Sequence, residues 1–555
     1  MKTISKFILI SGVALSSVSC DGFLDLSPTD AVTDRMMWSD PEYAELYVNS
    51  FYSYINVYSQ YYTSGQCAYG LTEGLTDMLK YSCGSNNNTG VHYGFMNQFV
   101  YGISGTTAAS CAFYLSNWGT AYEEIRRINE FLYSMNEYSE FDQETKTRFE
   151  AEARFFRGMV YFELVKRHNA VIVYRENMLD YDRNTPLNTE EESWNIVEED
   201  LSFAAHNLPS EWTGDDQGRV TSYAAYALLS RAMLYAERWQ SALDAANEVK
   251  GFTLMPGTTS EEYAKCFSTT ALQGNTESIL DYSYQNGALD HNFDYYFSPG
   301  GDNEGNANAL GTPTQEMVEE YEYADGGEVD WSPWHVDGGT TEEPPYSQLE
   351  PRFGATVLYN GAEWKGRTIE AFEGGEDGWV APGTFRNEGK TTTGYFLRKL
   401  VDESHTDLVS VNSTQPWVML RYAEVLLNKA EAAYRLGDNA TANSAVREIR
   451  ARVGLPYTDK TGNDLWNAIR KERKIELSYE GLYFWDLRRW GVLVDEFDGT
   501  TVHGLKITSE GSEFRYTYID CDEQNRQYTD KIYQIPLPES ELSYNKAVSQ
   551  YEEWL

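Results

Sequence analysis

The sequence predicts a mainly α-helical fold, in which a tetratricopeptide-like framework of paired helices carries an irregular, loop-rich face for ligand binding. Three observations predict this class. Apolar residues recur at helical spacing over long stretches, two stretches hold helix pairs in the same register, and helical periodicity disappears between about residues 268 and 415. The 555 residues include 14 Trp, 42 Tyr and 24 Phe, which is ample material for a packed core.

The first 19 residues have the pattern of a signal peptide. Lys2 and Lys6 precede an apolar run at 7–18, which is shorter than a membrane span and leads through small residues to Cys20. A cysteine in this position resembles the lipidation site of bacterial lipoproteins. We therefore expect residues 1–19 to be removed, Cys20 to carry the lipid and residues 20–38 to form a tether. The alternative is an ordinary signal peptide cut near Ser19, which leaves Cys20 as a thiol.

The helical framework is expected at about residues 39–267 and 416–495. Ser39-Asp40-Pro41-Glu42 is a capping box with proline in the first turn, and it predicts a helix through about Tyr54. Three longer helices are predicted from apolar stripes at helical spacing, at 118–132, 149–164 and 194–208.

Two helix pairs joined by short turns are predicted at 226–249 and 426–449. They resemble tetratricopeptide repeats, whose small alanine positions let the second helix pack closely on the first. Each pair alone would leave an apolar face exposed, so the pairs must pack on the other helices. We therefore expect residues 39–555 to form a single domain, with a C-terminal segment at 496–555.

The insertion at about 268–415 is punctuated by glycine and proline, which predicts loops, turns and short strands. A second irregular stretch runs from about 56 to 107. Long irregular segments inside a compact protein are commonly functional. We expect the two regions to form one loop-built face.

The charge excludes some classes of partner. Asp plus Glu number 85 against 44 Lys plus Arg, giving a formal charge of −41 that disfavours nucleic acids and other polyanions. The motifs of zinc peptidases, serine hydrolases and phosphate-binding loops are missing from the sequence. We predict no catalytic residues and no cofactor.

One segment has the spacing of a calcium loop. Asp180, Asp182, Asn184 and Glu191 follow that spacing, but Thr185 stands where the sharp turn requires glycine. No metal site is predicted.

Five segments resemble the SusD/RagB family, surface lipoproteins of gut and oral Bacteroidetes. The most specific is 469–490, Ile-Arg-Lys-Glu-Arg-Lys-Ile-Glu-Leu-Ser-Tyr-Glu-Gly-Leu-Tyr-Phe-Trp-Asp-Leu-Arg-Arg-Trp; the others are 20–29, 150–164, 421–434 and 533–538. The resemblance spans essentially the whole chain after the signal peptide. Asp21, directly after the lipidated cysteine, fits the signal that sends such lipoproteins to the outer face of the outer membrane.

The resemblance implies a helical fold on tetratricopeptide-like units and no catalysis. Proteins of this family act as a lid over a SusC-like TonB-dependent transporter, capture an oligosaccharide at the cell surface and deliver it into the barrel. RagB-type members deliver peptides instead. We expect a lipid-anchored, surface-exposed outer-membrane protein that binds a largely neutral glycan. Peptide capture, and a scaffold that only holds other proteins, stay open as alternatives.

The expected ligand-binding residues combine aromatic platforms with polar donors and acceptors, because a sugar ring has apolar C–H faces and a rim of hydroxyls. Two stretches have this mix, the first flanked by Tyr58, Tyr61 and Tyr62, and the family resemblance places the glycan site in loops of these two parts of the chain. The candidates are Asp77, Tyr81, Asn86 and Asn87 from the first stretch, Tyr284, Phe293, Tyr295 and Tyr296 from the second, and Trp331 and Trp334 from the glycine-rich region.

The charges of the C-terminal motif are expected to serve the structure rather than a ligand. Glu472, Arg473, Glu476, Glu480, Asp486, Arg488 and Arg489 are dense around Trp485 and Trp490. We predict a buried network of ion pairs there.

Overall fold

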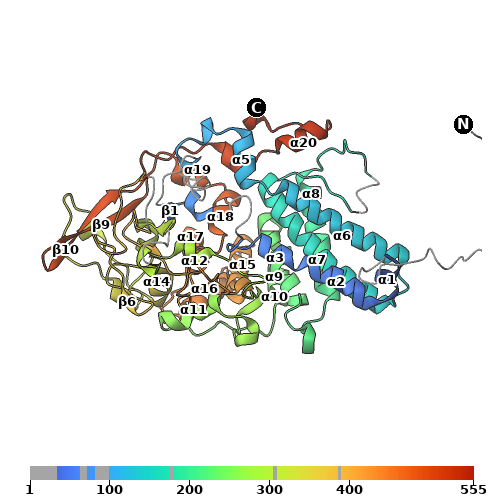
Figure 1. The fold of residues 1–555 in the computed structure, drawn as a ribbon, viewed down its shortest axis with the longest axis horizontal. Coiled ribbons are helices and arrows are strands. Elements are labelled where there is room, and N and C mark those ends of the chain that lie inside the picture. The colour runs from blue at the N-terminus through green and yellow to red at the C-terminus, as the bar shows by residue number, and fades with distance from the viewer. Residues whose placement is uncertain (1–33, 63–71, 82–98, 176–180, 304–308, 385–388) are drawn as a thin grey trace, which may run out of the picture.

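The structure is a computed structural model that describes residues 34–62, 72–81, 99–175, 181–303, 309–384 and 389–555 (Figure 1). Cys20, Asn86 and Asn87 lie outside these ranges. Within them, every helix is too short or too polar to cross a lipid bilayer.

The helices dominate the fold. They are α1 (Asp34–Ser39), α2 (Pro41–Phe51), α3 (Ser53–Val57), α5 (Ala108–Leu115), α6 (Trp118–Tyr138), α7 (Gln143–His168), α8 (Glu190–Asn207), α9 (Ser222–Tyr235), α10 (Trp239–Glu248), α11 (Ser260–Ser268), α12 (Phe293–Phe297), α13 (Gln315–Glu319), α14 (Pro351–Thr356), α15 (Tyr422–Arg435), α16 (Asn439–Arg452), α17 (Gly462–Glu476), α18 (Tyr483–Arg489), α19 (Leu493–Phe497) and α20 (Glu539–Tyr544).

The strands are short and pair in twos, all antiparallel. They are β1 (Leu79–Tyr81), β2 (Ser278–Tyr282), β3 (Gly311–Pro313), β4 (Val357–Leu358), β5 (Glu363–Trp364), β6 (Arg367–Thr368), β7 (Phe396–Leu397), β8 (Trp417–Arg421), β9 (His503–Glu510) and β10 (Glu513–Asp520).

The three long helices α6, α7 and α8 lie side by side, at the opposite end of the molecule from the hairpin of β9 and β10 (Figure 1). Helix α7 begins where Asp142 accepts a hydrogen bond from the Thr145 amide at 2.8 Å, and from Phe149 to Val165 it is buried around most of its circumference. Gly158 lets α8 approach closely, because a Cβ there would lie 2.9 Å from the Leu201 side chain. The three helices predicted from apolar stripes are confirmed.

The two predicted helix pairs are α9 with α10 and α15 with α16. Helix α10 packs on α15, so the pairs stack on each other, as tetratricopeptide units do. The small residues Ala242 of α10 and Ala442 and Ala445 of α16 are buried, which lets the helices approach closely. A buried ion pair between Arg231 of α9 and Glu424 of α15, at 2.5 Å, joins the two units. The mainly helical, tetratricopeptide-like fold class is therefore confirmed.

The loop-rich insertion is anchored to the framework by strand pairing. Strand β2 pairs with β8, which leads directly into α15, and β1 pairs with β3. Where the structure describes it, the insertion holds short helices and strands of two to five residues, as its glycine and proline content predicts.

Two details differ from the sequence predictions. Helix α2, which the capping box predicts, has Asp40 rather than Ser39 as its N-cap, with the Asp40 carboxylate accepting from the Glu42 amide at 3.0 Å, and it ends at Phe51. The segment after residue 496 contains the hairpin of β9 and β10, whose strands have eight residues each. This hairpin was not predicted, because its alternation of apolar and polar residues is short and interrupted by charges.

Candidate functional site

Two tyrosine-rich stretches that are far apart in the sequence meet in the structure. The ring of Tyr61 stacks on His291 with ring centroids 3.9 Å apart, and it lies 5.2 Å from the ring of Phe293 and 5.9 Å from that of Tyr284. The hydroxyl of Tyr61 also accepts a hydrogen bond from the Gln415 amide at 2.7 Å. The structure therefore joins the first predicted stretch to the second.

Tyr284 is fixed at this junction by its hydroxyl. The hydroxyl donates to Oδ1 of Asn56 at 2.6 Å and lies 3.3 Å from the hydroxyl of Ser59. Burial raises the pKa of Tyr284, so it stays a neutral donor. Its ring packs against that of Tyr282, with centroids 5.1 Å apart, and Tyr282 pairs with Trp417 across the β2–β8 ladder.

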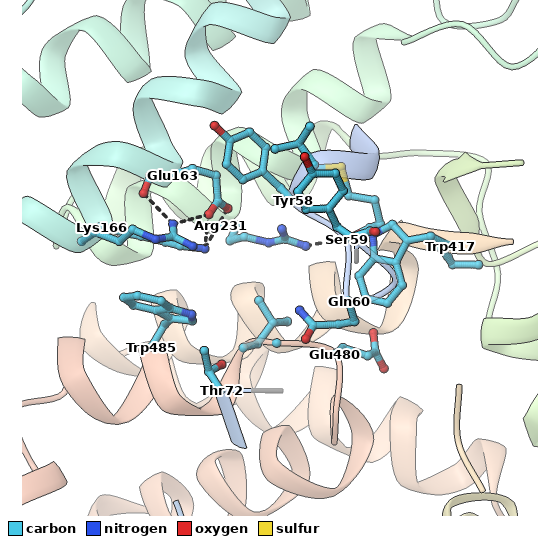
Figure 2. Close-up of a pocket in the computed structure, with 17 residues that line it drawn as sticks. Tyr58, Ser59, Gln60, Thr72, Glu163, Lys166, Arg231, Trp417, Glu480 and Trp485 are labelled. Carbon is cyan, nitrogen blue, oxygen red and sulfur yellow. Dashed lines mark hydrogen bonds and ion pairs between the residues drawn. The ribbon is translucent and has the colours of Figure 1, made fainter. Parts of the chain in front are cut away.

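A small cavity of about 110 Å³ lies beside this junction. Figure 2 shows Trp485 and Thr72 on the side of the cavity opposite Tyr58 and Ser59. Ligand pockets usually have about 300–1,000 Å³. The cavity is thus too small for a sugar ring, and a larger ligand would have to lie over its rim.

Tyr58 and Tyr62 line this cavity, whereas Tyr284 and Tyr282 lie behind its wall, against Ser59 and Trp417 respectively. These four half-buried tyrosines are called the tyrosine rim below. The nearby side chains of Gln60 and Asn56 add amide donors and acceptors. Aromatic rings beside amide groups are the chemistry that a sugar ring requires.

The walls of the cavity carry charge. Glu163 forms ion pairs with Lys166 at 2.7 Å and with Arg167 at 2.5 Å. Burial alone would raise the pKa of Glu163, but these two cations lower it to about 2. Burial, together with the neighbouring Arg167, lowers the pKa of Lys166 to about 7 although Glu163 opposes this.

The other predicted residues of the first stretch have structural partners. Asp77 is half-buried and forms an ion pair with Lys474 at 2.8 Å. Tyr81 is buried in β1, where its ring packs so closely on Gly74 that a Cβ there would lie 2.2 Å from the ring. In this conformation the ring of Tyr81 is not open to a ligand.

The aromatic residues of α12 have different exposures. Phe293 is buried and stacks on Phe297 with centroids 4.3 Å apart, and Tyr296 is also buried. Tyr295 is half-buried, with its ring 5.2 Å from that of Tyr296. Of these predicted residues, Tyr295 is the one that presents part of its ring to solvent.

Trp331 and Trp334 form a separate aromatic pair. Their rings lie 5.5 Å apart, both are buried, and Nε1 of Trp334 donates to the carbonyl of Glu342 at 2.8 Å. The turn that holds them packs on β10. The structure does not bring these two residues into the tyrosine rim.

Sequence reasoning missed Asn56, Ser59, Gln60 and Trp417. The first three lie within a stretch that the sequence marks only by its tyrosines, and Trp417 comes from a strand more than 100 residues after Tyr284 in the chain. The strand pairing that brings Trp417 opposite Tyr282 is not visible in a single sequence.

The charged C-terminal motif forms the predicted buried ion-pair network. The guanidinium of Arg421 contacts carboxylates of Glu277 at 2.7 Å, Glu476 at 2.6 Å and Glu480 at 2.6 Å. Arg473 pairs with Asp486 at 2.6 Å. These groups have buried partners of opposite charge, so the prediction of a structural role is confirmed.

Arg488 departs from this prediction: it forms no ion pair with the described residues and donates to backbone carbonyls instead. Its guanidinium contacts the carbonyls of Lys166 at 2.8 Å and of Ile532 and Tyr533 at 2.7 Å each. The Lys166 carbonyl is in the last turn of α7, so Arg488 stabilises the C-terminal end of that helix.

A metal site is not apparent in the described ranges, where no group of three His, Cys, Asp or Glu side chains has the arrangement to hold an ion. Asp182 instead accepts a hydrogen bond from the Asn184 amide at 2.8 Å within its own loop.

The fold and the rim define a class of protein: a tetratricopeptide-like helical framework that presents a loop-built, aromatic face. A model described as the SusD family matches residues 276–554, and a model described as starch-binding associating with outer membrane matches residues 85–234. The chain belongs to the SusD family.

Individual relatives agree with this assignment. SusD-like protein P25 of Formosa agariphila is 22% identical over 507 residues, covering 89% of this chain and 91% of that protein. The crystal structure of a SusD-like protein from Bacteroides fragilis has a TM-score of 0.80 at 28% identity and covers 95% of this chain and 99% of the other. A SusD-like carbohydrate binding protein from the same species has a TM-score of 0.75 at 22% identity, with 92% and 100% covered.

Proposed function

We propose that this protein captures a largely neutral glycan at the cell surface and passes it to a SusC-like TonB-dependent transporter in the outer membrane. The observation that carries the proposal is the meeting of two distant tyrosine-rich stretches at one rim, in a chain of the SusD family. A solved relative is described as carbohydrate binding, which supports the ligand class.

The rim has the chemistry for this task. The C–H faces of a sugar ring would pack on the rings of Tyr282 and Tyr284, while Gln60 would exchange hydrogen bonds with its hydroxyls. The formal charge of −41 disfavours polyanionic glycans. Asp77, Asn86, Asn87 and Tyr295 stay part of the proposal as further contacts.

The remaining elements of the proposal concern location and reaction. Lipidation of Cys20 would tether the protein to the outer membrane, with the folded part exposed at the surface. The protein would act by binding alone, without catalysis.

Affinity electrophoresis of the mature protein against neutral and acidic polysaccharides tests the proposal. We expect one neutral polysaccharide to retard the wild type, and the double variant Tyr282→Ala plus Tyr284→Ala to lose this retardation. The matched control is Tyr138→Ala, a well-exposed tyrosine at the end of α6.

The outcomes separate the alternatives. Retardation by acidic polysaccharides alone would contradict the neutral ligand. Migration unchanged by every polysaccharide, together with co-purifying peptides, would favour peptide capture. Retardation that survives in the double variant would place the site elsewhere.

A further inference from the structure

A second cleft, separate from the tyrosine rim, lies beside α9 and α10. It has a volume of about 520 Å³, within the usual range for ligand pockets. Its walls come from the loop between α8 and α9, the turn after α10 and the first residues of β2. This cleft is large enough for sugar rings, whereas the cavity beside the rim is not.

Aromatic rings line the cleft without being buried. Trp212, Tyr223 and Phe252 are each half-buried, and the rings of Tyr223 and Phe252 meet edge to face with centroids 5.7 Å apart. Nε1 of Trp212 donates to the Val220 carbonyl at 2.9 Å, which fixes the indole in place. Gly251 has φ +88°, a conformation that favours glycine and turns the chain directly before Phe252.

The cleft also offers hydrogen-bonding groups with unused capacity. Oδ2 of Asp281 accepts bonds from the Ala271 amide at 2.8 Å and the Ser278 hydroxyl at 2.7 Å, whereas its Oδ1 has no hydrogen bond to the described residues. The hydroxyl of Tyr223 and the side-chain amide of Gln217 likewise bond to none of the described residues. Such acceptors and donors are what sugar hydroxyls need.

The cations of the cleft are already neutralised. Arg219 pairs with Glu45 at 2.7 Å, Asp216 at 2.8 Å and Glu152 at 2.9 Å, and Lys250 pairs with Glu248 at 3.0 Å. An anionic ligand would therefore gain little here, while the Asp281 carboxylate would repel it. The chemistry favours a neutral, polyhydroxylated ligand.

We propose that this cleft is a second saccharide-binding site, in which sugar rings pack on Tyr223 and Phe252 and a pair of hydroxyls donates to Asp281. The ligand class rests on the proposed function, but the residues are independent of the rim. Asp281 lines the cleft and the next residue, Tyr282, belongs to the rim, so the two sites are neighbours along β2.

Isothermal titration of the mature protein with laminaritriose, maltotriose and cellotriose tests the inference. With a trisaccharide that binds, we expect two ligands per wild-type chain and one per chain in the variant Tyr223→Ala plus Phe252→Ala. Asp281→Asn, which keeps the shape of the side chain, should weaken one of the two events about tenfold. The matched control is Tyr226→Ala, a half-buried tyrosine of the same helix that lies outside the cleft.

Each outcome decides a distinct point. One event that survives in the cleft variants and disappears in Tyr282→Ala plus Tyr284→Ala overturns the cleft and leaves the rim. Two events that both survive in the folded Asp281→Asn variant with unchanged affinity also overturn it. Binding of none of the three trisaccharides by a wild-type protein that a neutral polysaccharide retards overturns the cleft and leaves the neutral-glycan proposal in place.

Discussion

The ion-pair network around Arg421 and the tyrosine rim are both rich in polar and aromatic side chains, yet they differ in how fully their groups are satisfied. In the network, the guanidinium of Arg421 meets three carboxylates and is almost completely buried. In the rim, Tyr282 and Tyr284 are half-buried and Gln60 is partly open to solvent. Polar groups whose hydrogen bonds and ion pairs are all made stabilise a structure. Polar groups with unused hydrogen-bonding capacity beside exposed rings are available to a ligand.

The largest expected effect is a loss of stability when the ion-pair network around Arg421 is broken. Arg421→Ala leaves the buried carboxylates of Glu476 and Glu480 without a major partner, so the free energy of unfolding should fall by about 3–5 kcal/mol. Urea unfolding of the variant measures this. A loss below about 1 kcal/mol would contradict the structural role of the network.

Glu73 differs from the carboxylates of the network, because it is buried and has no ion pair with the described residues. Burial raises its pKa to about 7, whereas the unfolded chain releases the proton above a pKa of about 4.3. Its stabilising contribution is thus present below about pH 4 and is lost as the pH rises through 7. Glu73→Gln should raise the free energy of unfolding at pH 8 by about 2–3 kcal/mol.

The same variant provides its own control at low pH. At about pH 4.5 Glu73→Gln should change the free energy of unfolding little, because the native carboxyl is then protonated and the amide oxygen can still accept from the Gly481 amide. Urea unfolding at both pH values measures the difference. An equal effect at the two values would contradict the raised pKa.

Substitutions in the tyrosine rim should change the affinity for the glycan rather than the stability of the fold. Tyr282→Ala removes a half-buried platform, and the glycan affinity should fall by about 1–3 kcal/mol, or roughly 5- to 150-fold. Tyr282→Phe keeps the ring and should bind nearly as the wild type does. Isothermal titration with the retarding polysaccharide measures both, and equal affinity in all three proteins would exclude stacking on Tyr282.

The smallest effect is expected at an exposed ion pair. Arg447 pairs with Asp459 at the surface, where the two side chains are 47% and 64% exposed. Arg447→Ala should change the free energy of unfolding by less than about 1 kcal/mol, because solvent screens the pair. Urea unfolding measures the change. A larger loss in the free energy of unfolding would contradict the expectation that exposed ion pairs stabilise the protein less than buried ones.

The helices were predictable from local pattern. The apolar stripes of α6, α7 and α8 and the alanine-rich pairs α9–α10 and α15–α16 repeat at helical spacing, so each element reveals its own buried face. The structural role of the C-terminal charges was also predictable, because dense opposite charges among tryptophans must be paired when they are buried. The hairpin of β9 and β10 was not, because it has no comparable local pattern.

The candidate site was predictable only in part. Sequence reasoning selected Tyr284 and the flanking Tyr58, Tyr61 and Tyr62, which the structure brings together. It equally selected Tyr81, Trp331 and Trp334, which are buried. Residue type alone does not distinguish a platform from a core ring, because both require the same aromatic side chain.

By itself, the sequence determined the helical class, the paired repeats and the family resemblance, since these depend on periodicities and motifs within short segments. Only the tertiary structure decided which aromatic rings are exposed, that Trp417 lies opposite Tyr282, and that a second cleft forms around Asp281. Those features depend on contacts between residues far apart in the chain, which are set by the packing of loops on the framework.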